Sequence, residues 1–278
     1  MRGKCGHPPA ESYFCAMLEK VLRDAAHAGA NELRKYFNNP DLQTSFKAGG
    51  VNDLVTEADH AADKAIIGVI KSQFPDHFIL SEETGNVATD SEYKWIIDPI
   101  DGTINFAQGI PICCVSIGLE KNGEMIMGVV YAPFLNEFYF TEKGKGAFLN
   151  DKQIHVSKQQ NVIHSCMVTG FPYSYVNMPN GPLECFERFI RRGIPVRRLG
   201  SAAIDLCWVA AGRFDGFYEH KLNAWDSAAG WLLVEEAGGT VTNFEGAPYS
   251  PYQPKIVATN GLIHEELLQW LRGDIPVE

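Results

Sequence analysis

Two short apolar runs constrain the fold of this chain more than any other feature. They are His77–Leu80 (HFIL) and Lys94–Ile97 (KWII), and polar residues bound each of them. Runs of this kind are typical of central strands that are buried on both faces of a sheet. Glu82 and Glu83 closely follow the first run, and Asp98 directly follows the second. The chain is therefore expected to place carboxylates at the ends of buried strands.

Helical and hairpin patterns surround these strands. Residues 12–37 repeat apolar side chains at intervals of three and four, which predicts an amphipathic helix. A second helical pattern begins after Thr56 and runs to about Phe74, with Thr56 able to cap it and Asp59 at the capping-box position. Asn122–Gly123 separates two β-rich runs and predicts a tight hairpin.

The second half of the chain continues the alternation. The expected elements are a hairpin over 137–150, a strand over 162–170, helices over 182–193 and 201–214, a strand over 215–220, a helix over 226–236, strands over 240–244 and 255–260, and a helix over 264–273. This mixture indicates a layered α+β or mixed α/β fold. The 278 residues, 45% of them hydrophobic, show no internal repeat or evident linker, so we expect a single domain in two closely packed halves, about 1–150 and 151–278.

Charge and cysteine content narrow the choice of partner and compartment. The net charge of −10 argues against a nucleic-acid partner, and the cluster Arg191, Arg192, Arg197 and Arg198 is interpreted as a solvated turn and strand edge. The seven cysteines show no zinc-binding spacing, which favours a reducing cytoplasm. No apolar run approaches the length of a membrane span, so no membrane association is expected.

The segment Trp95–Phe106 (WIIDPIDGTINF) carries the strongest chemical signal. Pro99 has no N–H group, so the strand is expected to stop near Asp98 and the chain to turn there. Asp98 and Asp101 would then lie at the carboxyl end of a strand, where open α/β sheets bind ligands. Two carboxylates so close repel each other unless one pKa rises or a cation lies between them. The Ile100 carbonyl supplies a third oxygen.

These residues allow two interpretations. Oxygen ligands without His or Cys suit Mg²⁺, and the Gly102 and Thr103 amides that follow could hold a phosphate. Alternatively, Asp98 and Asp101 could be local backbone acceptors in an Asx turn and a helix cap. The spacing alone leaves both open.

Acidic residues at other element junctions favour the metal interpretation. Glu82 follows a predicted strand, Asp226 lies at a helix start, and Asp59 is in a predicted capping box. Each has a structural role available when taken singly. Together with Asp98 and Asp101 they indicate a multinuclear metal site. The chain has no G-x-S-x-G, P-loop or H-E-x-x-H motif that would support a competing chemistry.

The motifs resemble those of the inositol monophosphatase family of Mg²⁺-dependent, lithium-sensitive phosphatases. The likeness is carried by WIIDPIDGTINF at 95–106, LSEE at 80–83 and NAWDSAAGWLLVEEAGG at 223–239, and it extends over nearly the whole chain. The resemblance implies a layered αβαβα sandwich, a homodimer and two or three Mg²⁺ ions per site. It further implies that Glu82, Asp98 and the Ile100 carbonyl bind the first metal and that Asp98, Asp101 and Asp226 bind the second. Glu82 would also touch a third, weaker metal site.

The resemblance also implies roles around the metals. Thr103 would help orient the attacking water, with Asp53 and Thr56 behind it and Asp59 supporting the site. Together with Glu82 these are the implied catalytic residues. The implied substrate contacts are Glu82, Asp101, Gly102, Thr103, Gly200, Ser201, Ala202, Glu219 and Asp226. Ile104 and Gln108 depart from the common family pattern, which leaves the substrate preference open.

The expected function is Mg²⁺-dependent hydrolysis of myo-inositol 1-phosphate, or of a similar polyol or sugar monophosphate, by an activated water without a phosphoenzyme. Alternative substrates are fructose 1,6-bisphosphate, histidinol phosphate and 3′-phosphoadenosine 5′-phosphate. An alternative of a different class is a non-catalytic interaction role in transcription or ribosome assembly.

Overall fold

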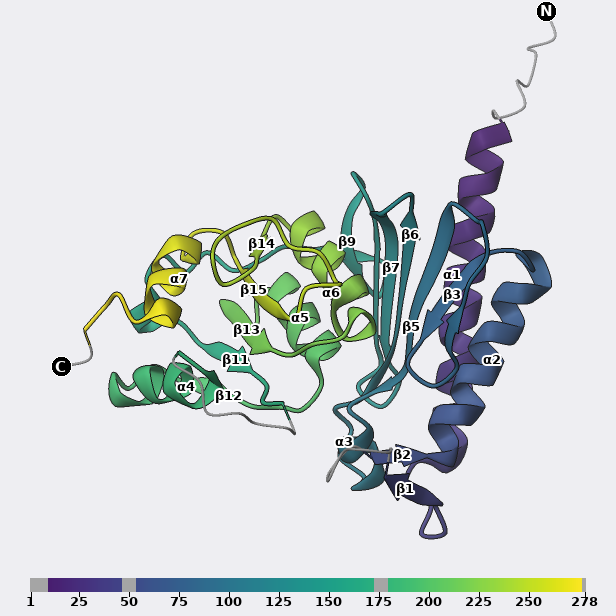
Figure 1. Ribbon diagram of the computed structural model, residues 1–278, viewed down its shortest axis with the longest axis horizontal. Coiled ribbons are helices and arrows are strands. Elements are labelled where there is room, and N and C mark those ends of the chain that lie inside the picture. The colour runs from purple at the N-terminus through teal and green to yellow at the C-terminus, as the bar shows by residue number, and fades with distance from the viewer. Residues whose placement is uncertain (1–9, 47–53, 173–179, 277–278) are drawn as a thin grey trace, which may run out of the picture.

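The computed structural model describes residues 10–46, 54–172 and 180–276. Helices and sheets alternate in five layers, which Figure 1 shows from right to left. The helical layers are α1 (Ala10–Tyr36) with α2 (Glu57–Gln73), α5 (Ala202–Ala210) with α6 (Ala224–Glu236), and α4 (Pro182–Arg191) with α7 (His264–Arg272). An eight-stranded and a five-stranded sheet lie between them. The predicted αβαβα sandwich is confirmed.

The two sheets are built from consecutive parts of the chain. The first has the order β10-β9-β8-β7-β6-β5-β3-β4, with β3 (Phe78–Ser81), β4 (Gly85–Val87), β5 (Tyr93–Asp101), β6 (Cys114–Lys121), β7 (Glu124–Ala132), β8 (Glu137–Glu142), β9 (Gly146–Leu149) and β10 (Lys152–Ile154). The second has the order β12-β11-β13-β15-β14, with β11 (Met167–Thr169), β12 (Val196–Arg197), β13 (Gly216–His220), β14 (Thr240–Thr242) and β15 (Lys255–Thr259). Smaller elements are the β1–β2 pair (Thr44–Phe46, Leu54–Thr56), α3 (Thr103–Ala107) and the 3₁₀ turn Val162–His164.

Both faces of the first sheet are covered, as the apolar runs predict. Helices α1 and α2 pack on one face, around fully buried Leu22, Ile66 and Trp95. The Trp95 indole nitrogen donates to Nδ1 of His77 at 3.0 Å, so the buried ring is anchored to the turn before β3. The other face meets α5 and α6 through a second core. A strand such as β5 must therefore carry its polar groups at its ends.

Glycines allow α6 to approach this sheet closely. Gly118 and Gly128 are paired across β6 and β7 and both face α6. A Cβ on Gly128 would lie 3.1 Å from the Cα atom and from the carbonyl oxygen of Ala229, and one on Gly118 would lie 3.0 Å from Cβ of Ala228. Bare backbone at these positions lets helix and sheet come together. The first turn of α6, which carries Asp226, is thereby brought to the sheet.

Most predicted elements are confirmed, but β5 is not as expected. The prediction that the strand stops near Asp98 is wrong, because β5 continues to Asp101 through a β-bulge. Asp98 pairs with Ser116 and Asp101 with Cys114, so Pro99 and Ile100 together oppose a single residue of β6. A bulge leaves a residue without a ladder bond, and this is where a strand tolerates proline.

Other boundaries also differ from the prediction, and the helix predicted over 201–214 ends at Ala210. The first residues of the predicted strand over 162–170 form the 3₁₀ turn, where the Val162 N–H donates to the Glu266 carboxylate of α7 at 3.1 Å. Helix α6 begins at Ala224 rather than Asp226, since Asn223 is its N-cap. Among the described helices none is long and apolar enough to cross a membrane. The single-domain organisation and the homodimer stay predictions.

Filling the space at Gly128 should destabilise the fold. Gly128→Val forces α6 away from the sheet, and overpacking of this kind costs about 1–3 kcal/mol. We expect a lower midpoint in urea unfolding. Gly68→Ala in α2 is the matched control, because a Cβ there meets no atom within 4 Å and alanine favours a helix by about 0.5–1 kcal/mol. Unchanged stability of Gly128→Val would show that the close approach is not required.

Candidate metal and phosphate site

The site begins where β3 ends beside its parallel neighbour β5, which continues further. Strands β3 and β5 are parallel neighbours, with Ser81 paired to Ile97. The Glu82 N–H donates to the Ile97 carbonyl at 3.1 Å, so Glu82, just past the end of β3, lies beside the part of β5 where Asp98 begins the bulge. Glu82 and Asp98 interact electrostatically, but only Glu82 follows a strand end, because Asp98 lies within β5.

The bulge in β5 directs its two aspartates differently. Asp98 Oδ1 accepts the Ile100 N–H at 3.0 Å, which is the local acceptor role of the Asx interpretation. Among the described residues, no hydrogen bond from a backbone N–H of its own turn is seen for Asp101. Its Oδ2 atom accepts the Ser201 hydroxyl at 2.6 Å and the Ala203 N–H at 2.7 Å, both at the start of α5. Asp101 therefore joins the end of β5 to the first turn of a helix a hundred residues away.

Gly102 has little room for a side chain. Its φ angle is 89°, and an added Cβ would lie 2.9 Å from the Ile112 carbonyl oxygen and 3.2 Å from that of Gly200. Only glycine adopts this backbone conformation readily. The turn brings Gly200, Ser201 and Ala202 next to Gly102, so the predicted phosphate and substrate segments lie together.

Asp226 reaches the same place from α6. It is the third residue of the helix, and its Oδ2 atom accepts the N–H of the N-cap Asn223 at 2.6 Å in a capping box. The expected structural role is thus real, and it fixes the carboxylate rather than excluding it from the site. Burial raises the pKa of Asp226 well above its usual range, and repulsion by Asp101 raises it further.

Burial and mutual repulsion dominate the electrostatics of the carboxylates. Burial raises the pKa of Asp98 well above its usual range, and Glu82, Asp101 and Asp226 raise it further. Burial raises the pKa of Asp101 to about 6, although the bonds from Ser201 and Ala203 act in the opposite direction. Folding thus concentrates negative charge that a divalent cation would stabilise.

The donors fit magnesium. Asp98, Asp101, Asp226, Glu82 and the Ile100 carbonyl are all hard oxygen groups, which Mg²⁺ prefers. Among the described residues, no group of three or more His, Cys, Asp or Glu side chains is already arranged so that it could hold a metal ion. Hydrogen bonds hold Asp98, Asp101 and Asp226 each at one oxygen, locally for Asp98 and Asp226 and from α5 for Asp101, and the other oxygens must turn inward to meet a cation.

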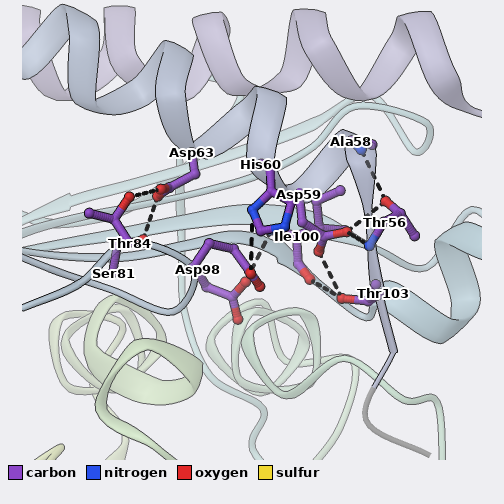
Figure 2. Close-up of polar contacts among 11 residues, drawn as sticks. Thr56, Ala58, Asp59, His60, Asp63, Ser81, Thr84, Asp98, Ile100 and Thr103 are labelled. Atoms are coloured by element: carbon purple, nitrogen blue, oxygen red, sulfur yellow. Dashed lines mark hydrogen bonds and ion pairs between the residues drawn. The ribbon is translucent and has the colours of Figure 1, made fainter. Parts of the chain in front are cut away.

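Thr103 and the predicted residues behind it form a hydrogen-bonded chain, shown in Figure 2. The Thr103 hydroxyl lies 3.1 Å from Oδ1 of Asp59 and 3.0 Å from the Ile100 carbonyl oxygen. Oδ2 of Asp59 accepts the Thr56 N–H at 2.8 Å and the Thr56 hydroxyl at 2.6 Å, which confirms the capping box. Burial raises the pKa of Asp59 to about 6. Asp53 lies outside the described residues.

The predicted alcohol side contains one more buried acidic residue than the sequence suggested. Glu219 is buried, and its carboxylate lies where a side chain on Gly170 would be. Asp205 on α5 is buried too, and its Oδ1 atom has no hydrogen-bond partner within the described part of the chain. Burial raises the pKa of both acids, each repels a site carboxylate, and Arg198 opposes the shift in both.

Sequence reasoning missed Asp205 and Asp63. Asp205 stands four residues after Ser201, so helical spacing could have placed it on the face that carries the site residue. Asp63 stands four residues after Asp59 in the same way. It accepts hydroxyl bonds from Ser81 and Thr84, which flank the predicted metal ligand of this turn.

Comparison with known proteins agrees with this geometry. The model of the inositol monophosphatase family matches residues 16–275. The chain belongs to the inositol monophosphatase family. An inositol-1-monophosphatase of Synechocystis is 44% identical, over 91% of this chain and 88% of that protein. The Nus factor SuhB of Pasteurella multocida is 40% identical, over 91% of this chain and 94% of that protein.

A solved structure extends the likeness to three dimensions. The extragenic suppressor protein SuhB of Bartonella henselae aligns with a TM-score of 0.86 at 38% identity, over 93% of this chain and 100% of that one. Membership of the inositol monophosphatase family makes this chain a phosphatase, a hydrolase of phosphoric monoesters. The segments that suggested the family, 98–103 and 223–226, are those that meet in the site described above.

Removing one buried charge should stabilise the metal-free protein. Asp98→Asn keeps an oxygen for the Ile100 N–H and relieves repulsion. A carboxyl whose folded pKa is raised destabilises the fold as pH rises from its unfolded value, about 3.9, through its folded value. With a chelator present, Asp98→Asn should therefore melt above wild type at pH 8, by on the order of 3 °C for each kcal/mol relieved.

The decisive measurement is how the difference in melting temperature between Asp98→Asn and wild type changes with pH. The advantage of Asp98→Asn should shrink as pH falls towards about 3.9, because the wild-type carboxyl is then protonated in the folded state and increasingly protonated in the unfolded state. Buried histidines with lowered pKa values, such as His220, are present in both proteins, so their contribution cancels. Added Mg²⁺ should raise the melting temperature of wild type more than that of the variant. A variant that is less stable than wild type at pH 8 without metal would contradict the repulsion.

Proposed function

We propose that this protein is a Mg²⁺-dependent phosphomonoesterase that hydrolyses myo-inositol 1-phosphate or a similar polyol or sugar monophosphate. The observation that carries the proposal is the meeting of carboxylates from the turn after β3, from β5 and from α6 beside the Gly102–Thr103 turn, in a chain of the inositol monophosphatase family. Glu82, Asp98, Asp101, Asp226 and the Ile100 carbonyl are the proposed metal ligands.

Bound Mg²⁺ supplies positive charge that holds a phosphate and activates water. The chain itself supplies the orientation of these groups. Asp98 and Asp226 are fixed by N–H groups of their own elements, and Asp101 by the start of α5. Because these anchors are backbone groups, the proposed ligands keep their places when substrate enters. The Gly102 and Thr103 amides are proposed to hold phosphate oxygens.

Thr103 and Asp59 are proposed to manage the proton of the attacking water. The Thr103 hydroxyl has one proton and two acceptors, Asp59 Oδ1 and the Ile100 carbonyl, so it donates to one of them and offers its own lone pairs to water. The pKa of Asp59, raised to about 6, suits proton transfer near neutral pH. Thr56 holds Asp59 in place.

The alcohol side favours a neutral polyol over a second phosphate. Buried Glu219 and Asp205 offer no positive charge to a second phosphate, and their carboxyl groups can form hydrogen bonds with hydroxyls. Two side chains that follow the Gly102–Thr103 turn are engaged within the protein. The Asn105 amide donates to the Ile112 and Leu199 carbonyls, and Phe106 is buried. Within that segment, Ile104 is therefore the residue left to influence the substrate.

A substrate panel tests the proposal directly. Phosphate release with Mg²⁺ should be fastest for myo-inositol 1-phosphate or another polyol monophosphate, and lithium should inhibit it. Asp98→Asn should lower the rate by about 100-fold or more, since a proposed ligand of both metals is lost. Asp90→Asn, which changes an exposed carboxylate, is the control and should stay near wild type.

Each outcome of the panel has a distinct meaning. Faster turnover of 3′-phosphoadenosine 5′-phosphate, histidinol phosphate or fructose 1,6-bisphosphate would replace the substrate assignment and keep the phosphatase. Full activity of Asp98→Asn, or full activity in a chelator, would overturn the metal assignment itself.

A second candidate function is a role in transcription, favoured by the likeness to a protein named Nus factor SuhB. Such a role would use the outer surface rather than the carboxylates. Purified RNA polymerase should then bind wild type and Asp98→Asn equally well. Absence of binding in a direct titration with both proteins would reject this candidate.

A further inference from the structure

One face of α2 carries two acids a helical turn apart, Asp59 and Asp63, and both point towards the loops that follow parallel strands (Figure 2). Asp59 binds Thr103 after β5, as described above. Asp63 contacts the turn after β3. The spacing of four residues thus matches the two neighbouring loops of the sheet.

Asp63 is bound at both ends of the turn. Its Oδ1 atom accepts the Ser81 hydroxyl and its Oδ2 atom accepts the Thr84 hydroxyl. Ser81 is fully buried and Asp63 is 4% exposed. The two residues between these anchors are Glu82 and Glu83, so a single carboxylate fixes the first and last residue of the turn that presents Glu82.

The same contacts separate Asp63 from the ligands. Asp98 and Asp226 accept their anchoring N–H bonds at one oxygen, whereas both oxygens of Asp63 hold hydroxyl groups. Bonds to a carboxylate are stronger than neutral ones. Burial protects the Ser81 bond from competition by water, whereas Thr84 is exposed. A third contact from α2 reaches the same turn, where Nδ1 of His60 lies 3.7 Å from a carboxylate oxygen of Glu83.

We propose that Asp63 is a positioning residue that holds the Ser81–Thr84 turn so that Glu82 meets the cation site in a fixed orientation. The proposal rests on the function proposed above. Asp63 is proposed to order the turn before the metal binds. Without Asp63 the turn must become ordered on binding, and the free-energy cost of this ordering weakens metal binding. Helix α2 would then set the positions of both metal-bearing loops, through Asp59 for one and Asp63 for the other.

The test measures metal binding on the full chain, separately from catalysis. Titration calorimetry with Mn²⁺ alone should show binding about 10-fold or more weaker for Asp63→Asn, the size of effect known for residues that orient ligands. Asparagine can still accept one hydroxyl bond but not both. Thr84→Val, which removes one of the hydroxyls, should weaken binding in the same direction, and the double variant should add little to Asp63→Asn.

The controls separate positioning from general stability. Asp90→Asn should bind Mn²⁺ as wild type does. If Asp63→Asn lowers only the melting temperature and leaves the affinity of the folded protein unchanged, the proposal is overturned. Should Asp63→Asn not fold, Ser81→Ala and Thr84→Val carry the same test from the other side of the bonds, and wild-type affinity in both would also overturn it.

The wild-type protein distinguishes this inference from the proposed function. If wild type binds Mn²⁺ but releases no phosphate from any phosphomonoester, the function fails while the binding test of Asp63 stands. If wild type binds no divalent cation, both fail together.

Discussion

Repulsion among buried carboxylates is the constraint on which the rest of the structure depends. Asp98, Asp101 and Asp226 are collected in one place, and burial together with their mutual repulsion raises their pKa values. Such a cluster opposes folding unless each group is bonded and a cation is at hand. The surrounding layers supply the bonds, and the proposed magnesium supplies the charge.

The layered fold meets this constraint with local anchors. Asp98 is held by the bulge in its own strand, and Asp226 by the cap of its own helix. Asp101 is held by the start of α5, where the helix dipole also favours a negative charge. Close packing of α6 on Gly118 and Gly128 brings the anchor of Asp226 to the sheet. The packing of the layers therefore determines how the charges of the site are stabilised.

The elements that the sequence predicted best are those governed by short-range physics. The capping box of Thr56 and Asp59 and the Asn122–Gly123 hairpin follow from local bonds and backbone preferences, and both are present. The end of β5 was predicted wrongly because Pro99 forbids a ladder bond but permits a bulge. Which of the two occurs depends on the partner strand, and the local sequence carries no information about that.

The sequence by itself determined which carboxylates stand at element ends and, through its family motifs, the chemistry they suggest. Tertiary structure alone decided that Asp101 binds the first turn of α5, that Asp205 is buried beside Glu219, and that Asp63 joins α2 to the turn after β3. The physical reason is the separation along the chain over which each kind of interaction acts. Periodicity and capping act within a few residues, whereas these contacts exist only once parallel strands pair and helices pack across the sheet.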